Sequence, residues 1–308
     1  MLNIGGSTLE STIIIFLDGV GIGVNDPTIN PFFKYNFSIF SKLFNDTPHL
    51  GNQVIKKDGR FIFPTDAVMD VPDLPQSGTG QTSIFCGVNA QRVLGRHFGP
   101  FPHSSLLPLI REMNIFKAFK TKKLDVVFAN AYPKIFFDYI NSGKRRLTVT
   151  SLSCLLSDVK LKNATDLRNG DALSAEIINE RWVNELSYSL KIIKPETAAK
   201  RLLKLASKHH FTLYEYFLTD HLGHGRRAET METTLMVLDK FLLFVMENLP
   251  EDTTLLICSD HGNLEDISQK SHTLNPALTI TAGKHAEHLF NKITNLSHIK
   301  NAILELYK

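Results

Sequence analysis

The chain has 308 residues, of which 43% are hydrophobic and 21% charged, and it carries a formal net charge of +3 at pH 7. These values exclude a disordered chain or a coiled coil as the main state. The small positive surplus also excludes a protein that binds nucleic acid mainly by neutralising phosphates. The length suits one large α/β domain, or a core with a smaller second region.

The cysteines and the N-terminal stretch point to a reducing compartment. Cys86, Cys154 and Cys258 lie far apart and form no Cys-x-x-Cys pair, so they do not make a disulfide framework. The N-terminal stretch lacks the basic start and the long apolar region of a signal peptide. No stretch approaches the roughly 20 apolar residues of a membrane span. We therefore expect a cytoplasmic protein that binds neither membrane nor nucleic acid, with its oligomeric state left open.

Along the chain, apolar runs at 12–17, 211–218 and 253–259 predict buried strands of a parallel sheet, and each run leads to an aspartate. A further short strand is predicted over 277–281. Apolar spacing and end signals predict helices over 31–43, 195–208, 228–248 and 299–307, and a helix that opens at Ser77. Strands that alternate with helices in this way are typical of an α/β fold.

The segment 91–195 is less regular and contains basic clusters, Lys122-Lys123 and Lys144-Arg145-Arg146. We interpret it as an insertion, so the predicted organisation is a core of residues 1–90 and 196–308 with a cap of residues 91–195. Candidate site residues lie on both sides of it, and the insertion should therefore emerge near the site and set specificity. The cluster at 144–146 either meets an anionic substrate or is an ordinary solvated face.

The aspartates Asp18, Asp220 and Asp260 follow the three predicted buried strands. One such aspartate alone is typical of a turn or a helix cap. In open α/β sheets, however, ligands gather at the carboxyl ends of the strands. The repetition therefore predicts that these three carboxylates converge in space.

Histidines accompany these carboxylates. His224 lies four residues after Asp220, His261 directly follows Asp260, and His272 lies in the loop before the 277–281 strand. Carboxylate and imidazole ligands suit Zn²⁺ or Mn²⁺, and the absence of thiolates argues against a structural zinc site.

Ser77 opens a helix between glycines and allows two interpretations. It is either an ordinary N-cap or a nucleophile that a metal and the helix N-terminus activate. The local sequence leaves both open.

Together these motifs resemble the alkaline phosphatase superfamily. The quoted segments, in chain order, are Asp18-Gly19-Val20-Gly21, Ser77 with Cys86-Gly87, Asp220-x-x-x-His224, Asp260-His261-Gly262-Asn263, and His272-Thr273-x-Asn275-Pro276. The last three are similar to those of cofactor-independent phosphoglycerate mutase and phosphopentomutase. The resemblance covers about 12–89 and 211–282 and implies a three-layer α/β core, with a mostly parallel sheet and helices on both faces.

The resemblance also implies the site. It places one divalent cation among Asp18, Ser77, Asp260 and His261, and a second among Asp220, His224 and His272. The two ions would be Mn²⁺ or Zn²⁺, and Ser77 would attack phosphorus to form a phosphoserine intermediate.

Three further residues are candidates for binding substrate. Gln81, one helical turn after Ser77, is a possible donor to a phosphoryl oxygen or an ordinary helix polar residue. Arg226 and Arg227 follow His224 and either bind substrate phosphate or form a solvated pair.

We therefore expect a metal-dependent phosphatase or phosphodiesterase that acts on a small phosphorylated substrate. The alternatives are a phosphomutase and, third, a metal-binding protein of the same fold without turnover. Other motifs fail: the dinucleotide fingerprint has Val24 where its third glycine belongs, the serine hydrolase elbow has Pro75 in place of its first glycine, and 77–83 holds no P-loop lysine. The sequence context of a sulfatase nucleophile is also missing.

Overall fold

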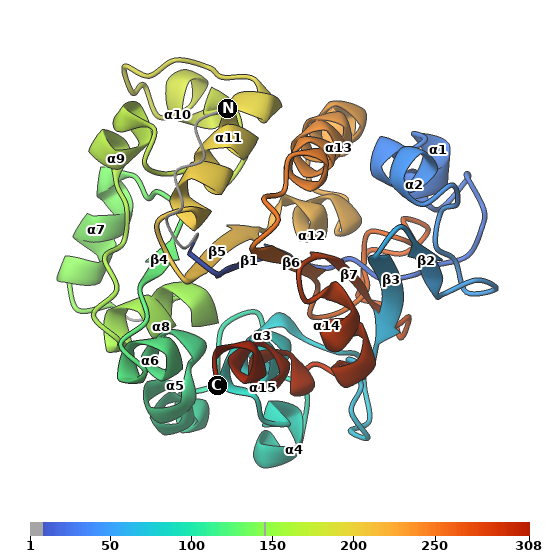
Figure 1. The fold of residues 1–308 in the computed structure, drawn as a ribbon, viewed down its shortest axis with the longest axis horizontal. Helices are drawn as coiled ribbons and strands as arrows, with labels where there is room; N and C mark the ends of the chain where they lie inside the picture. The colour runs from blue at the N-terminus through green and yellow to red at the C-terminus, as the bar shows by residue number, and fades with distance from the viewer. Residues whose placement is uncertain (1–8, 145) are drawn as a thin grey trace.

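A seven-stranded sheet runs through the centre of the computed structural model, which describes residues 9–144 and 146–308 (Figure 1). Its strands are β1 (Ser11–Leu17), β2 (Ile55–Lys57), β3 (Arg60–Thr65), β4 (Val126–Phe128), β5 (Phe211–Tyr216), β6 (Thr253–Cys258) and β7 (Ala277–Gly283), in the order β2-β3-β7-β6-β1-β5-β4. Residues 1–8, part of the stretch that we compared with a signal peptide, and Arg145 of the basic cluster lie outside the described residues.

The sheet is mostly parallel, as predicted. β1 lies between β5 and β6 and runs parallel to both, and β4 runs parallel to β5. β7 is antiparallel to β6, and β3 is antiparallel to β7, so β3 again points in the direction of β6. The order β6-β1-β5 brings the carboxyl ends of the three strands predicted from apolar runs to the same end of the sheet.

Helices cover both faces of the sheet, which explains why β1 is buried along its whole length. Ile13 and Ile15 pack into the apolar layer on one face, whereas Ile14 and Phe16 pack into the layer on the other. A central parallel strand needs apolar side chains on both faces, and the continuous run is the result. The predicted three-layer α/β fold is confirmed (Figure 1).

Two groups of helices form the outer layers. The first packs on the Ile13 face and comprises α1 (Pro31–Lys34), α2 (Ser38–Leu43), α11 (Pro195–Ala206), α12 (Leu218–Gly223) and α13 (Met231–Glu247). The second packs on the Ile14 face and comprises α3 (Ser77–Cys86), α4 (Ala90–Leu94), α5 (Leu107–Met113), α6 (Ile115–Thr121), α7 (Lys134–Asn141), α8 (Val149–Leu156), α14 (Ala286–Lys292) and α15 (His298–Leu304). A smaller apolar cluster holds α9 (Ala164–Asn169) and α10 (Glu180–Asn184).

Some predicted elements differ from the structure. The expected helix over 31–43 is two short helices, because Asn36 between them has a positive φ of 47°. β5 ends at Tyr216, so Asp220 lies in the first turn of α12 and not at the strand end. β2, β3 and β4 were not predicted.

Part of the segment 91–195 is built into the core. β4 pairs with β5 as an edge strand, and α5 and α6 pack in the same apolar layer as α3. The role of a cap is therefore proposed only for the part of 91–195 that lies outside this core. Among the described residues, no helix has both the length and the apolar content that crossing a membrane requires.

Candidate functional site

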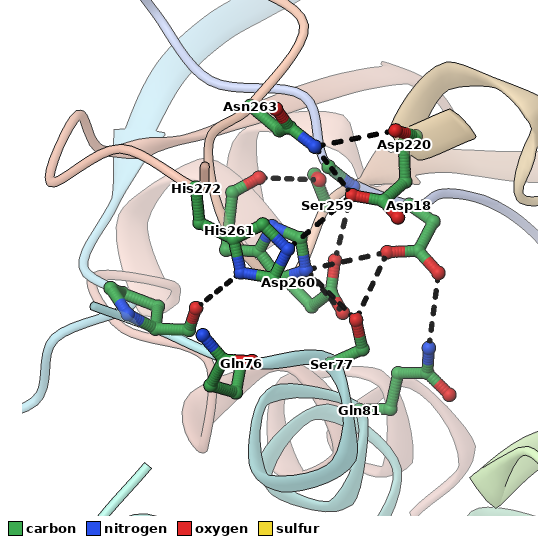
Figure 2. Close-up of polar contacts among 12 residues, drawn as sticks. Asp18, Gln76, Ser77, Gln81, Asp220, Ser259, Asp260, His261, Asn263 and His272 are labelled. Carbon is green, nitrogen blue, oxygen red and sulfur yellow. Dashed lines mark hydrogen bonds and ion pairs between the residues drawn. The ribbon is translucent and has the colours of Figure 1, made fainter. Parts of the chain in front are cut away.

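The three predicted aspartates meet at the carboxyl end of the central strands (Figure 2). Asp18 directly follows β1, Asp260 lies two residues after β6, and Asp220 lies in α12 just after β5. Asp18 is 8% exposed, and Asp260 is completely buried. Buried carboxylates are uncommon unless something compensates their charge, which makes this cluster a functional candidate.

A tight turn at Gly19 brings two of these carboxylates together. Gly19 has a φ of +66°, and a Cβ there would lie 2.8 Å from Oδ1 of Asp220. Its backbone N–H also donates to Oδ1 of Asp260 over 3.3 Å. Only glycine fits a position with both this backbone conformation and this close approach.

The three predicted histidines are held in a common way. In each, Nδ1 lies against a backbone carbonyl, which leaves Nε2 free to bind a ligand. The pairs are His224 with Lys270 O (2.7 Å), His272 with Pro75 O (2.6 Å) and His261 with Gly262 O (3.3 Å). This support by backbone carbonyls is the arrangement usual for metal-binding imidazoles.

The Nε2 atoms and carboxylates form two overlapping groups. Asp220, His224 and His272 place one ligand atom each within 4.8 Å of one another, and so do Asp18, Asp220 and His261. The first group is the ligand set that the resemblance implies for one cation. Asp220 belongs to both groups and lies between them.

Asp260 completes the second group. Its Oδ2 has no hydrogen-bond partner, although the residue is fully buried, and it lies 3.5 Å from Nε2 of His261. A buried carboxylate oxygen without a donor is costly unless a cation neutralises it. The residues of the site therefore fit divalent metal ions of the Zn²⁺ or Mn²⁺ type, which accept both oxygen and imidazole ligands.

The electrostatics of the cluster agree with this fit. Burial, together with the negative charge of Asp260, raises the pKa of Asp18 to about 7. Burial opposes a charged His261, yet Asp260 and Asp18 raise the pKa of that imidazole to about 10. Burial likewise opposes a charged Asp220, but hydrogen bonds with His224 and His272 hold its pKa well below the usual value. The crowded carboxylates thus favour positive charge among them.

Ser77 faces this cluster. It is the first residue of α3, and Gln76 occupies the N-cap position. The Ser77 Oγ lies 3.0 Å from Nε2 of His261 and 3.5 Å from Oδ1 of Asp18 (Figure 2). The hydroxyl therefore contacts two candidate ligands and does not cap the helix.

A cavity of about 580 Å³ opens beside Ser77. Gln81 lines it, and its Nε2 donates to Oδ2 of Asp18 over 3.4 Å, while its buried Oε1 has no partner. Arg226 also lines the cavity. Arg227 instead pairs with Glu185, at 3.0 Å, and is not among the lining residues.

The segment 91–195 contributes to the same cavity. Pro100, Phe101 and Thr148 line it together with the candidate ligands. Of the basic cluster at 144–146, Arg146 is exposed and its guanidinium lies over the ring of Phe101, 5.4 Å from the centroid. The segment thus reaches the site, although β4 belongs to the core sheet.

Sequence reasoning missed Glu265, a fully buried carboxylate in the loop after β6. It accepts hydrogen bonds from the backbone N–H groups of Gly21 and Asn263, both at 2.8 Å, from the hydroxyl of Thr273, and from Nδ2 of Asn275 at 3.0 Å. These donors lie on the loop after β1 and on the loop that joins β6 to β7. Three of these donors lie within ten residues of Glu265, but Gly21 lies 244 residues away, so the sequence around Glu265 does not reveal the contact with the loop after β1.

Two more polar residues support the site. Asn263 donates from Nδ2 to Oδ1 of Asp220 over 2.7 Å, which helps to orient that carboxylate. Glu215, on β5, accepts from the Thr150 hydroxyl at 2.7 Å, and burial raises the pKa of its carboxyl to about 8. Asn263 stands in a quoted motif, whereas Glu215 reads in the sequence as part of an apolar run.

Comparison with known proteins defines the family. A family model described as the Metalloenzyme superfamily matches residues 10–308. The chain belongs to this superfamily. This result confirms the predicted resemblance to the alkaline phosphatase superfamily. Membership of the metalloenzyme superfamily implies that the chain binds divalent metal.

Several solved structures are similar to this metalloenzyme. They are the PH0037 protein from Pyrococcus horikoshii (12% identity, 90% of this chain and 86% of that chain, TM-score 0.53), a cold-active alkaline phosphatase from the psychrophile Shewanella sp. (12%, 96% and 99%, 0.52), and the alkaline phosphatase of the Antarctic bacterium TAB5 (13%, 97% and 98%, 0.49). At such identities the likeness shows the fold alone. A search of curated proteins found no match.

Proposed function

We propose that this metalloenzyme is a phosphohydrolase that binds two divalent cations, Mn²⁺ or Zn²⁺, and transfers a phosphoryl group from a small phosphoester through Ser77. The observation that carries the proposal is the position of the Ser77 hydroxyl, 3.0 Å from His261 and 3.5 Å from Asp18 beside an open cavity. A hydroxyl on the first turn of a helix, next to candidate metal ligands, has the surroundings of an activated nucleophile.

The proposed ligand sets follow from the resemblance and from the contacts among the site residues. Asp220, His224 and His272 would hold one ion, and Asp18, Ser77, Asp260 and His261 the other, with Asp220 close enough to approach both. When bound, the two cations would lower the pKa of the Ser77 hydroxyl and neutralise charge on the phosphoryl oxygens.

The reaction would have two steps. Ser77 Oγ loses its proton to solvent in the cavity and bonds to phosphorus, while the bond from phosphorus to the leaving oxygen breaks and the leaving alcohol takes a proton from water. A water molecule then loses a proton to solvent as it attacks the phosphorus of the phosphoserine, the bond from phosphorus to Oγ breaks, Oγ takes a proton from water to restore the hydroxyl, and phosphate leaves. The N-terminus of α3, where Ser77 lies, would favour the negative charge of the phosphoryl oxygens.

Other side chains would position the substrate. Gln81 has an amide held by Asp18, and its Nε2 can donate to a phosphoryl oxygen once a cation occupies that carboxylate. Arg226 at the cavity would bind the same anion, whereas Arg227 is already engaged by Glu185. The residues that the 91–195 segment places in the cavity support a role of this segment in specificity.

Two serines of α3 provide a matched test. Ser77→Ala should lower turnover of any phosphomonoester by orders of magnitude, with little change in stability, since Ser77 makes no capping bond. Ser83 donates to Gln91 inside the protein, away from the cavity, so Ser83→Ala should cost about 1–2 kcal/mol of stability and keep turnover. Kinetics with added Mn²⁺ or Zn²⁺ and urea unfolding measure both. A Ser77→Ala protein that keeps most of its turnover contradicts the proposal.

A hydrolase and a phosphomutase differ in the molecule that accepts the phosphoryl group from Ser77. If water is the acceptor, adding a second alcohol leaves the release of inorganic phosphate unchanged or slightly lowered. If the protein is a phosphomutase, phosphate release stays low and the phosphoryl group moves to a hydroxyl of the substrate. Phosphorus NMR of the product mixture distinguishes the two. Metal uptake without turnover of any phosphoester would leave the third alternative, a binding protein.

A further inference from the structure

The cavity beside Ser77 has an apolar side that phosphoryl transfer itself does not use. Leu74, Pro100, Phe101 and Phe217 all line it, next to the candidate metal ligands and Ser77. Phe101 and Phe217 are only partly buried, so each ring leaves apolar surface uncovered. Small-molecule sites commonly combine a few placed polar groups with such apolar and aromatic walls.

Phe101 is held in place by the helix that carries Ser77. The backbone N–H of Thr79, in the first turn of α3, donates to the carbonyl of Phe98 over 2.9 Å. A Cβ on Gly78 would lie only 2.3 Å from the carbonyl oxygen of Phe101, so the loop lies directly on the helix. The position of Phe101 relative to Ser77 is therefore fixed by backbone contacts.

Arg146 contacts the ring of Phe101 from outside the cavity. The guanidinium of Arg146 lies over the ring, 5.4 Å from the centroid, and Arg146 does not line the cavity. A cation over an aromatic face stabilises this arrangement. Phe101 thus lines the cavity, and the Arg146 guanidinium contacts its ring from outside the cavity.

Phe217 is held by the element that carries Asp220. It directly precedes α12, and its ring packs against that of His221 with centroids 5.2 Å apart. The same short stretch of chain therefore positions Asp220 and the rings of Phe217 and His221. Phe217 and Phe101 come from different segments of the chain and line the same cavity as Ser77.

The cavity is larger than a phosphate group requires. Its volume of about 580 Å³ lies in the range of roughly 300–1,000 Å³ that holds drug-sized ligands. Water takes about 30 Å³ per molecule, so a phosphoryl group with its metal ions would leave much of this space to the rest of the substrate. Four apolar side chains on that wall favour an apolar occupant.

We propose that Phe101 and Phe217, with Leu74 and Pro100, form a subsite for the leaving group, and that the substrate is a phosphate ester of an alcohol that bears an apolar ring. The inference deepens the proposed function and rests on it for the reaction. It disfavours a phosphoglycerate or a pentose phosphate as substrate, because hydroxyl or carboxylate groups that lie against these four apolar side chains would find no hydrogen-bond partner there.

Binding of phosphonates tests the subsite without any turnover. We expect the wild-type protein, loaded with Mn²⁺ or Zn²⁺, to bind phenylphosphonate at least about tenfold more tightly than methylphosphonate in titration calorimetry. Phe101→Ala and Phe217→Ala should each reduce this preference severalfold. Phe33→Ala removes a partly exposed ring on α1, outside the cavity, and should keep the preference.

The outcomes separate the subsite from the reaction. Equal affinity for the two phosphonates, no binding of phenylphosphonate, or a preference that neither variant changes overturns the subsite. A preference for phenylphosphonate in a protein that turns over no phosphoester supports the subsite and contradicts the proposed function. Where turnover is found, 2-phenylethyl phosphate should exceed ethyl phosphate in kcat/KM by a similar factor, since their alcohols are of similar acidity. A higher kcat/KM for glycerol phosphate than for 2-phenylethyl phosphate overturns the subsite.

Discussion

At the scale of single residues, Glu265 joins the loops that carry the candidate ligands. Its two carboxylate oxygens accept four hydrogen bonds, one from the loop after β1 and three from the loop that joins β6 to β7. Asp18, His261 and His272 stand on these same loops. The carboxylate therefore acts on the site through its neighbours, as a positioning residue.

The substitution Glu265→Gln tests this role. The amide keeps the size of the side chain but cannot accept from all four donors, so it leaves at least one buried N–H or O–H unpaired. We expect a loss of about 1–3 kcal/mol in the free energy of unfolding and weaker binding of Mn²⁺ or Zn²⁺. Urea unfolding and metal titration measure the two effects. Glu232→Gln, on the exposed side of α13, is the control, and metal affinity equal in all three proteins would refute the role.

Glu215 predicts a dependence of stability on pH. Burial raises the pKa of its carboxyl from 4.5 to about 8 in the folded protein, so the neutral form is the one that the fold stabilises. This contribution is complete below about pH 4.5 and is lost as the pH rises through 8. In chelator-treated protein, the free energy of unfolding should fall over this window by an amount on the order of a few kcal/mol. Glu215→Gln should flatten the fall, and an unchanged slope would contradict this.

At the scale of elements, the sequence predicts best where burial is continuous. β1, β5 and β6 are central strands with helices on both faces, so their apolar runs stand out. β2, β3 and β4 escape prediction because two of them have only three residues and all three lie toward the edges of the sheet, where polar side chains are tolerated. The strand-end aspartates and their histidines were predictable, whereas Glu265 and Glu215 were not, because their roles depend on contacts across the fold.

The first turn of α3 depends on its contact with the 98–101 loop. Gly78→Ala would place a methyl group 2.3 Å from the Phe101 carbonyl oxygen, so the loop must move away from the helix. We expect a loss of about 1–3 kcal/mol in stability and, since Phe101 moves too, a smaller preference for phenylphosphonate. Gly51→Ala, where the nearest atoms belong to the end of the His49 side chain, is the control. Unchanged stability of Gly78→Ala would contradict the close packing.

At the scale of the whole molecule, the site brings together residues from Asp18 to His272, so only the folded chain can assemble it. Cations that bind the folded state alone must therefore stabilise it. This coupling links metal occupancy to the melting temperature. It also explains how a cluster of carboxylates as crowded as Asp18, Asp220 and Asp260 is compatible with a stable fold.

Metal removal tests the coupling. Each cation at a concentration of 100 times its Kd should add about 2.7 kcal/mol to the free energy of unfolding. We therefore expect a chelator to lower the melting temperature, and elemental analysis after dialysis to find two ions per chain. Asp260→Asn should lose one or both ions. A melting temperature indifferent to chelator, in a protein that takes up neither Mn²⁺ nor Zn²⁺, would contradict the ligand assignment.

In the proposed function, Ser77 carries the phosphoryl group during turnover at a two-cation site. The most direct test of this role is to mix the metal-loaded protein with a phosphomonoester, quench with acid and identify the modified peptide by mass spectrometry. We expect one phosphoryl group on the peptide that contains Ser77, present with Mn²⁺ or Zn²⁺ and absent with chelator. Turnover of the ester without any phosphoryl group on Ser77, or with one on a different residue, would contradict it.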